Sequence, residues 1–363
     1  MAVLLMIGTR KGLWLARSDD DRKRWSLGDP HFFMQEIPAC AIDTRTDPPR
    51  LLVGARSEHW GPSVFHSDDI GVSWQEPDGG AVRFPAEAEA AVKAVWQLRP
   101  DTEARPGVVW AGTEPSALWR SDDGGKTFAL VDGLWDHPHR PTWEPGFGGQ
   151  AIHTVLPHPT DDDRVLVAMS TGGVYRTTDG GKSWNPSNQG IKAYFLPGPW
   201  PEYGQCVHKV ARDAVDPDLL FLQNHHGVYK SADGGGKWTS IADGLPSDFG
   251  FPVVAHPARN GVAWLVPLVA DGERVPPGGG LAVWGTTDSG ESWQSAAKGL
   301  PQSGFYASVL RDAFTADDLP APAGLYLGAR DGSVYVSADE GRSWTEIVDH
   351  LPDILCLRAA AMP

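Results

Sequence analysis

Cysteine is scarce in this chain: Cys40, Cys206 and Cys356 are the three found among 363 residues. Three scattered cysteines are too few for a disulfide framework or for a metal site built from several thiolates. Each lies in an apolar stretch, so we expect three buried free thiols. Long apolar runs are also missing, because residues 2–7 are too short for a secretory signal or a membrane span. We therefore expect a cytoplasmic protein with no membrane partner.

Positive charge is in the minority: 31 Lys and Arg stand against 46 Asp and Glu, a formal charge of −15. A surface that binds nucleic acid needs clustered Lys and Arg, so we expect no nucleic-acid partner, although a local basic pocket remains compatible. Turn-forming residues are plentiful, with 42 Gly and 31 Pro, and 16 Trp can contribute to a core. Frequent turns favour many short strands over long helices.

One eight-residue pattern, which we call the aspartate motif, recurs along the chain. It reads Ser or Thr, any residue, Asp, any residue, Gly, any residue, a small or polar residue, and an aromatic. A degenerate copy at residues 18–25 has Arg22 in place of Gly. Successive copies begin about 50 to 56 residues apart, which is the spacing of four-stranded propeller blades. The six regular copies span residues 67–74, 121–128, 177–184, 231–238, 286–293 and 337–344.

The residue types of the aspartate motif suit a tight hairpin. The Asp carboxylate can accept backbone N–H groups across the turn, and the Gly can take a positive φ. The aromatic can return to pack between neighbouring sheets, where burial of a Trp contributes on the order of 3 kcal/mol. We therefore interpret these residues as structural rather than catalytic.

The strands around the motifs predict one all-β domain over residues 1–363, a seven-bladed β-propeller of four-stranded antiparallel blades. The N-terminal blade, residues 3–25, lacks an innermost strand, and residues 354–359 form an apolar strand with no motif after it. Joining the two closes the ring and removes a free sheet edge. The other innermost strands are predicted at residues 39–42, 92–95, 152–156, 207–211, 253–255 and 307–310.

The aspartate motif resembles the bacterial neuraminidase (BNR) or Asp-box repeat. That repeat occurs in sialidases, xyloglucanases, sortilin-type receptors and photosystem II assembly-factor-like propellers, so the resemblance supports the fold more than any one activity. A true sialidase is not expected, since the chain has no Arg-Ile-Pro signature and sialidases usually have six blades. Xyloglucanases pair two propellers around a cleft, whereas this chain has one. The resemblance also implies that the motifs lie on the face opposite the functional loops.

Two predicted innermost strands share a pattern that places a histidine at equivalent positions, His153 and His208. We align Lys93 with them one blade earlier, and His225 and His226 follow in the turn after the next strand. A histidine cluster near the channel can act in acid–base catalysis or hold a metal. The alternative, that these histidines only bond neighbouring loops, stays open. No cofactor is expected, although a metal held by histidines is compatible with the pattern.

Three turns between second and third strands carry Arg10, Arg56 and Arg330, on blades that become consecutive once the ring is closed. Converging guanidinium groups could bind a carboxylate or phosphate, or all three could be solvated turn residues. If the histidines lie beside them, an anionic ligand should bind more weakly as the pH rises through about 6.5.

Aromatic residues are dense in the loops at residues 134–149 and 191–205, which precede the two histidine-bearing strands. They could stack on a sugar, dock a protein partner or pack the loops together. Carboxylates on the same face leave a glycosidase pair open, with Glu36 and Glu114 as our candidates. The remaining predicted ligand-binding residues are His59, Trp60, Trp143, Trp200 and Tyr203.

Three functions follow. The first is a propeller that binds, or binds and hydrolyses, a glycan or small anionic molecule in its central pocket. If the protein is an enzyme, it is expected to resemble a glycoside hydrolase. The second is a non-enzymatic scaffold that holds a protein through the aromatic loops. The third is a metal-dependent enzyme with His153, His208 and His225 or His226 as ligands.

Overall fold

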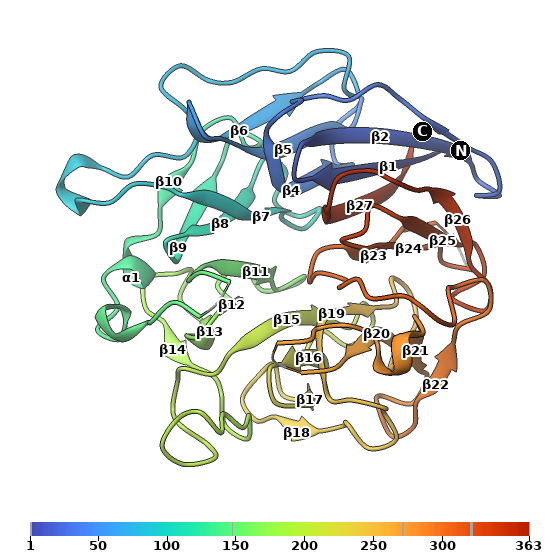
Figure 1. Ribbon diagram of the computed structural model, residues 1–363. Helices are drawn as coiled ribbons and strands as arrows, with labels where there is room; N and C mark the ends of the chain where they lie inside the picture. Colours follow the sequence, from blue (N-terminus) through green and yellow to red (C-terminus); the bar gives the residue numbers. More distant parts are fainter. Residues whose placement is uncertain (1, 147, 271, 320–321, 363) are drawn as a thin grey trace.

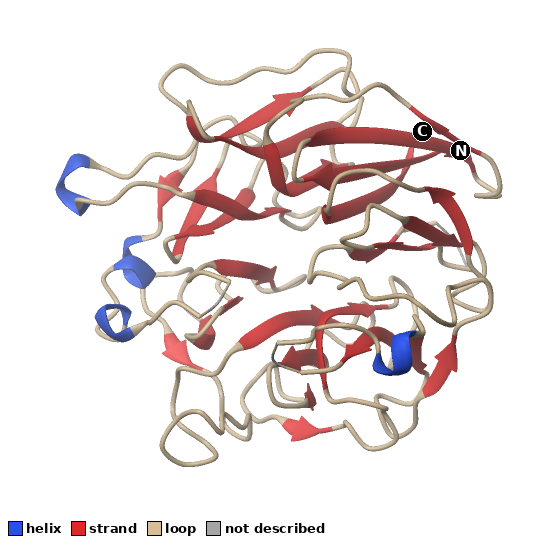
Figure 2. Ribbon diagram, in the orientation of Figure 1, coloured by secondary structure: helices blue, strands red, loops and turns tan. Residues whose placement is uncertain are grey.

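Seven antiparallel sheets are arranged in a ring around a central axis, as the computed structural model shows (Figures 1 and 2). The structure describes residues 2–146, 148–270, 272–319 and 322–362. Helices are confined to α1 (Asp132–Trp135) and the 3-10 turns η1 (Ala86–Ala88), η2 (Arg140–Thr142) and η3 (Pro277–Gly279) within these ranges. None of the described helices has the length and apolar character needed to cross a membrane.

The sheets are numbered here as blades 1 to 7, and each is given from its innermost strand outward. Blade 1 comprises β27 (Ile354–Met362), β1 (Ala2–Thr9), β2 (Gly12–Asp19) and β3 (Trp25–Leu27). Blade 2 comprises β4 (Glu36–Asp43), β5 (Arg50–Ser57) and β6 (Gly61–Ser67). Blade 3 comprises β7 (Ala94–Pro100), β8 (Val109–Glu114), β9 (Ala117–Ser121) and β10 (Ala129–Leu130). Blade 4 comprises β11 (Ile152–Pro157), β12 (Val165–Met169), β13 (Gly173–Thr177) and β14 (Asn185–Pro186).

The remaining three blades follow the same plan. Blade 5 comprises β15 (Val207–Arg212), β16 (Leu220–Asn224), β17 (Val228–Ser231) and β18 (Thr239–Ser240). Blade 6 comprises β19 (Phe249–Ala255), β20 (Ala263–Leu268), β21 (Val283–Thr286) and β22 (Gln294–Ala296). Blade 7 comprises β23 (Phe314–Ala316), β24 (Leu325–Gly328), β25 (Val334–Ser337) and β26 (Thr345–Val348). The predicted seven-bladed propeller is therefore confirmed.

The ring closes inside blade 1, where the two ends of the chain pair. β27 runs antiparallel to β1, with Ala2 opposite Met362 and Ile7 opposite Leu357, so the termini lie side by side (Figure 1). The amide of Leu357 also donates to the carbonyl of Asp312 at 2.7 Å, which joins the closing strand to blade 7. The predicted closure by the C-terminal strand is consistent with this sheet.

Two details differ from the sequence-based expectation. Blade 2 has three named strands, and its fourth is reduced to a single bridge between His66 and Gln75. In blade 7 the innermost strand is β23, so the prediction of a strand at residues 307–310 was wrong. The turn that follows each innermost strand shows where that strand ends. In blade 7 the amide of Asp317 donates to the carbonyl of Gly324, and in blade 5 the amide of Asp213 donates to the carbonyl of Leu219, so Asp317 and Asp213 hold equivalent positions.

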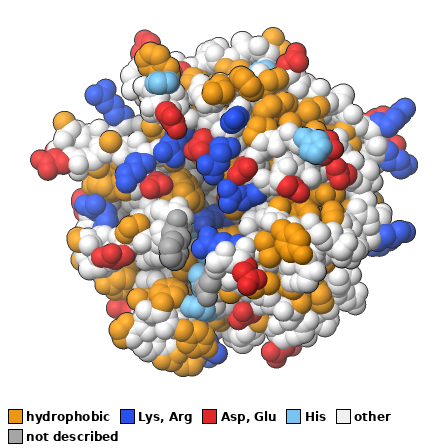
Figure 3. Space-filling view, viewed as in Figure 1, with side chains coloured by type: hydrophobic (Ala, Val, Ile, Leu, Met, Phe, Trp, Pro, Cys, Tyr) orange, Lys and Arg blue, Asp and Glu red, His pale blue; other side chains and the backbone are white. Residues whose placement is uncertain are grey.

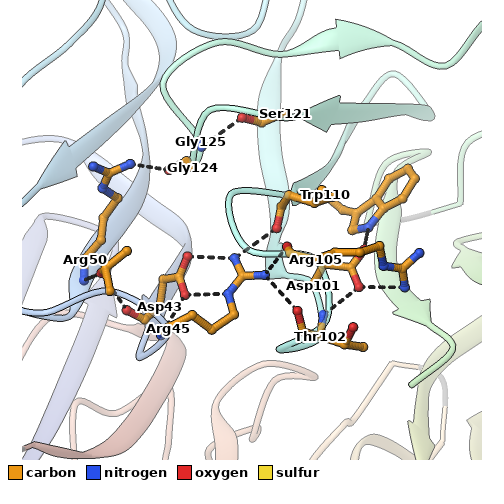
Figure 4. A network of polar contacts seen from close by, with 12 residues as sticks. Asp43, Arg45, Arg50, Asp101, Thr102, Arg105, Trp110, Ser121, Gly124 and Gly125 are labelled. Atoms are coloured by element: carbon orange, nitrogen blue, oxygen red, sulfur yellow. Dashed lines mark hydrogen bonds and ion pairs between the residues drawn. The ribbon is translucent and has the colours of Figure 1, made fainter. Parts of the chain in front are cut away.

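Blade 2 is held to blade 3 by arginines on the face where the innermost strands end (Figure 4). Arg45 forms a two-pronged ion pair with Asp43, both N–O distances being 2.7 Å. It also donates to the carbonyls of Thr102, Arg105 and Val108 in the turn between β7 and β8. The Arg45 guanidinium thus satisfies three backbone carbonyls of blade 3. These bonds hold blade 2, which lacks a full fourth strand, against its neighbour.

The aspartate motifs form the hairpins between third and fourth strands. In the first regular copy, Ser73 donates to Asp69 through both its amide and its hydroxyl, and Gly71 donates to Ser67. Hydrogen bonds from Ser73 lower the pKa of Asp69 to about 2, so the carboxylate is the charged acceptor that the hairpin needs.

The aromatic that ends a motif reaches the neighbouring blade. Trp238 donates through Nε1 to Ser187 of blade 4, and Trp293 donates to Ile241 of blade 5. Both indoles are buried, and the apolar clusters they join each contain residues of two adjacent blades. The core of the molecule is therefore divided among the seams between blades.

The degenerate motif at residues 18–25 uses its arginine as a bridge to the last blade. Arg22 takes φ 56, in the left-handed region that Gly occupies in the regular copies. Its guanidinium donates to both oxygens of Asp317 at 2.6 and 2.9 Å, and both side chains are buried. Tyr326 donates to the same carboxylate at 2.7 Å. The residue that departs from the pattern thus ties blade 1 to blade 7.

Arg22→Ala should lower the free energy of unfolding by about 3 to 5 kcal/mol, because it leaves Asp317 buried without its counter-ion. Arg24→Ala in the same hairpin is the matched control: its pair with Asp19 is exposed, and its loss should cost about 1 kcal/mol or less. Urea unfolding of both variants measures the difference. Equal losses would show that the buried pair does not stabilise the closure.

Candidate functional site

We call the face where the innermost strands begin the upper face; it also carries the turns between second and third strands. The opposite, lower face carries the aspartate motifs. All predicted site residues lie on elements of the upper face, but the structure places them in separate groups. Lys and Arg side chains, with Asp and Glu among them, gather around the centre of the face seen in Figure 3.

β-Bulges interrupt the innermost strands near the upper face. The pairing register shifts between Val95 and Gln97, between Ile152 and Thr154, and between Val207 and Lys209. A bulge adds one residue and reverses which face the following side chains take. The residues at the shift are Trp96, His153 and His208, so the structural counterpart of the two histidines in blade 3 is Trp96. The predicted equivalence of Lys93 with them was wrong.

His153 joins blade 4 to blade 5 from a fully buried position. Its Nε2 lies 2.9 Å from the Val207 carbonyl and its Nδ1 lies 3.0 Å from the Thr154 hydroxyl. Burial, with Arg311 and Lys209 nearby, holds the pKa of His153 well below 6.5. Both ring nitrogens are therefore engaged in a neutral imidazole, and this geometry favours the structural alternative over a catalytic base.

His208 is also buried, but it lies in a different setting. Its Nδ1 is 2.6 Å from the Gly250 carbonyl, and its Nε2 is 3.6 Å from the sulfur of Cys206. The His225 ring lies 5.6 Å away, and His226 contacts His225 at 4.7 Å between centroids. Burial, with Arg311 second, holds the pKa of His208 well below 6.5. His153 and His208 are therefore uncharged near pH 6.5, so their titration cannot produce the expected weakening of anion binding.

The cysteines differ from one another. Cys40 and Cys356 are fully buried, and their sulfurs contact each other at 3.5 Å between β4 and β27. Cys206 is only partly buried, so the prediction of a buried thiol there was wrong. It lies directly before β15, where the bulge begins.

The three predicted arginines meet at one side of the upper face. Glu36 pairs with Arg10 at 3.5 Å and with Arg56 at 3.3 Å, while Asp353 pairs with Arg10 at 3.6 Å and with Arg330 at 2.7 Å. The result is a chain of alternating charges across blades 2, 1 and 7. Each guanidinium already has a carboxylate partner, so the arginines converge but their charge is largely balanced. Glu36 serves here as an ion-pair partner.

A second group lines a pocket of about 220 Å³ between blades 3 and 4. Glu114, Lys93 and Trp143 are among its walls, joined by Gln150 and Arg140. The indole of Trp143 is held by a hydrogen bond from Nε1 to the Tyr175 hydroxyl at 3.1 Å. The pocket thus combines one carboxylate, cationic groups, an amide and aromatic walls. Three residues chosen from sequence for separate reasons lie together in it.

Large apolar side chains are exposed over much of the upper face. Trp60 is 90% exposed in the turn after β5, next to exposed His59. Tyr203 instead stacks on His139 with centroids 3.8 Å apart, so it packs two loops together. The exposed set on this face comprises Phe33, Met34, Trp60, Tyr194, Phe195, Trp200 and Tyr306.

The central channel contains a cavity of about 550 Å³ that none of the predicted residues lines. Lys209 and Arg358 pair with Asp312 at 2.8 and 2.5 Å, and Lys209 also donates to Gln97 at 3.3 Å. Burial lowers the pKa of Lys209 to about 8, while Asp312 opposes that shift. Arg99 also projects into the cavity, and no ion-pair partner for it is found within the described residues. Sequence reasoning missed this group. The available signal was a polar residue on an otherwise apolar innermost strand, such as Lys209 or Arg358.

No known family profile matches the chain. A xyloglucanase from Paenibacillus sp is 27% identical over 294 residues, which cover 78% of this chain and 24% of that protein. The chain spans between about a quarter and 29% of the length of the curated relatives it matches, all of them xyloglucanases. Our chain is thus similar in sequence to part of these enzymes.

Solved structures give the same fold. An ancestral GH74 enzyme aligns with a TM-score of 0.55 and 19% identity, over 82% of this chain and 37% of that one. YCF48 bound to D1 peptide aligns with a TM-score of 0.52 and 15% identity, over 83% of this chain and 78% of that one. At these identities the likeness shows the propeller fold alone.

The depressed pKa of Lys209 predicts a pH dependence of stability. The unfolded chain keeps the proton up to about pH 10.4, whereas the folded protein releases it near pH 8, so stability should rise with pH between these values. The slope from this one group is at most about 1.4 kcal/mol per pH unit. Lys209→Met should abolish that rise, and Lys298→Met, at an exposed lysine, should retain it. Urea unfolding at pH 8, 9 and 10 measures it; identical slopes in all three proteins would contradict the assignment.

Proposed function

We propose that this propeller binds a glycan in the pocket formed by Glu114, Lys93, Gln150, Arg140 and Trp143. The observation that carries the proposal is the composition of that pocket. Aromatic walls can stack on the apolar face of a sugar ring, while a few fixed polar groups bond its hydroxyls and set its orientation.

The pocket is preformed by local contacts. Gln150 accepts a hydrogen bond from the Ser116 amide at 3.3 Å and donates to the Ser170 carbonyl at 3.3 Å. Arg140 lies over the ring of Trp135 at 3.8 Å. Since these side chains are held before a ligand arrives, less conformational entropy is lost on binding.

The geometry supports binding rather than hydrolysis. Hydrolysis of a glycosidic bond by the common mechanisms requires two carboxyl groups across the bond. Glu114 is the one carboxylate that lines the pocket among the described residues, and Glu36 is engaged by two arginines elsewhere on the face. The similarity to xyloglucanases supports a glycan as the ligand class and suggests xyloglucan oligosaccharides as first probes.

Titration calorimetry with xyloglucan oligosaccharides and with a sugar acid tests the proposal. Glu114→Gln should weaken binding by roughly 10- to 150-fold, the effect of losing one charge-assisted hydrogen bond of about 1.5 to 3 kcal/mol. Glu58→Gln removes an exposed carboxylate on the same face outside the pocket, and it should leave binding unchanged.

Equal effects of the two substitutions, or no heat with any glycan, would contradict the proposed site. Thermal melting of both variants shows whether the fold is retained. Greater binding of the sugar acid than of neutral oligosaccharides would identify Arg140 and Lys93 as the principal contacts, and hence an anionic glycan.

A protein-interaction scaffold is the second candidate, favoured by the exposed aromatic residues of the upper face. Solitary exposed apolar residues are ordinary, whereas contiguous apolar patches mark contact surfaces, and Tyr194, Phe195 and Trp200 come from a single loop. Trp60→Ala and Trp200→Ala should then reduce recovery of a partner protein in pull-downs while leaving stability within about 0.5 kcal/mol. Glu114→Gln should not affect that recovery, which separates the two candidates.

A further inference from the structure

Cys206, His208 and His225 bring their side-chain ligand atoms within 4.8 Å of one another at the upper end of blade 5. We propose that these three residues bind a transition-metal ion, with Zn²⁺ as the resident metal. The site is separate from the glycan pocket, and either proposal can fail alone. It replaces the ligand set considered from sequence, because His153 is engaged on both ring nitrogens and Cys206 takes its place.

The strand pairing brings the ligands together. Cys206 and His208 stand two residues apart on either side of Val207, and the His225 amide donates to the Cys206 carbonyl at 2.9 Å. The pairing register shifts between Val207 and Lys209, so His208 is the extra residue of a bulge. A thiol and two imidazoles from adjacent strands therefore meet without any long connecting loop.

The distances suit a tetrahedral ion. A Zn–N bond of about 2.05 Å and a Zn–S bond of about 2.3 Å at a tetrahedral angle place nitrogen and sulfur about 3.6 Å apart. The Nε2 of His208 and the sulfur of Cys206 are 3.6 Å apart. All three ligand atoms lie within 4.8 Å of one another, so a shift of about an ångström at His225 completes the set.

His208 is oriented as metal-binding histidines usually are. Its Nδ1 lies 2.6 Å from the carbonyl of Gly250, which can only accept, so Nδ1 carries the proton. The lone pair of Nε2 then faces Cys206. A backbone carbonyl on the second ring nitrogen fixes the tautomer and raises the basicity of the ligating nitrogen.

A metal ion competes with protons for its ligands, because it binds the neutral imidazole and the thiolate. A bound Zn²⁺ ion displaces the thiol proton by its own charge, and the thiolate in turn offsets part of that charge beside Arg311.

The ligand types select the metal class. Thiolate and imidazole favour Zn²⁺ or copper, whereas Mg²⁺ and Ca²⁺ require oxygen ligands. Three protein ligands leave a tetrahedral ion one position for an outside molecule. Cys206 and His225 are partly exposed, so an ion can reach the site from the upper face.

The test uses the full chain after removal of metal with a chelator. Co²⁺ is the spectroscopic probe, since a thiolate ligand gives it a charge-transfer band in the near ultraviolet. Wild-type protein should bind about one Co²⁺ per chain with that band, and Zn²⁺ should displace it. Cys206→Ala should abolish the band, and His225→Ala should weaken binding roughly 10- to 100-fold or more. Cys40→Ala and His59→Ala, outside the cluster, should bind as wild type does.

A band that persists in Cys206→Ala, or its absence from wild-type protein, would overturn the proposal. Alkylation of wild-type thiols provides a measurement that needs no variant. Cys40 and Cys356 are fully buried, so Cys206 is the accessible thiol, and Zn²⁺ should slow its modification. An unchanged alkylation rate would also overturn the site, and tighter binding of Cu⁺ than of Zn²⁺ under reducing conditions would overturn the choice of metal.

Discussion

The carboxylate of Asp312 lies at the middle of the ring, where seven separate sheets converge. It accepts from Lys209 of blade 5 and Arg358 of blade 1, while the backbone carbonyl of the same residue accepts from Leu357. Burial alone would raise the pKa of Asp312, but the two cations hold it below its usual range. The seams between blades are filled by apolar side chains, whereas the channel is spanned by charge. Each buried charge there depends on the others, since an uncompensated one would cost several kcal/mol.

The repeat made the architecture predictable because its period, its turn residues and its terminal half-blades all indicate the same ring. The register of blade 7 was less predictable. Residues 307–310 have the apolar character of a strand, but they form part of the connection, and Phe314 to Ala316 pair instead. Apolar content alone does not separate a buried connection from a strand; the hydrogen bond from Asp317 that ends the strand does.

The candidate site shows where sequence reasoning loses information. The pattern shared by two innermost strands predicted His153 near the channel, but a bulge at that residue directs it to Val207. Lys209 lies after the equivalent bulge in blade 5 and lines the cavity. The blade order left two possibilities for Arg10, Arg56 and Arg330, convergence or separate solvated turns, and the structure links them through shared carboxylate partners. Their partner Asp353 comes from a loop with no repeat pattern, so the neutralisation was not predictable. The apolar neighbours of Cys206 in the sequence predicted a buried thiol. His225 approaches Cys206 through the pairing of adjacent strands, which the neighbouring residues do not reveal.

The pairing of β27 with β1 also sets an order in time. Thr9 lies opposite Ile354, so the partner of the first strand is synthesised 345 residues later. At translation rates of about 5 to 20 residues per second, this interval lasts roughly 20 to 70 seconds. Throughout it, the inner edge of β1 has no strand to pair with, and an open edge is a template for other nascent chains. The pairing that protects this edge in the finished fold is therefore not available during that interval.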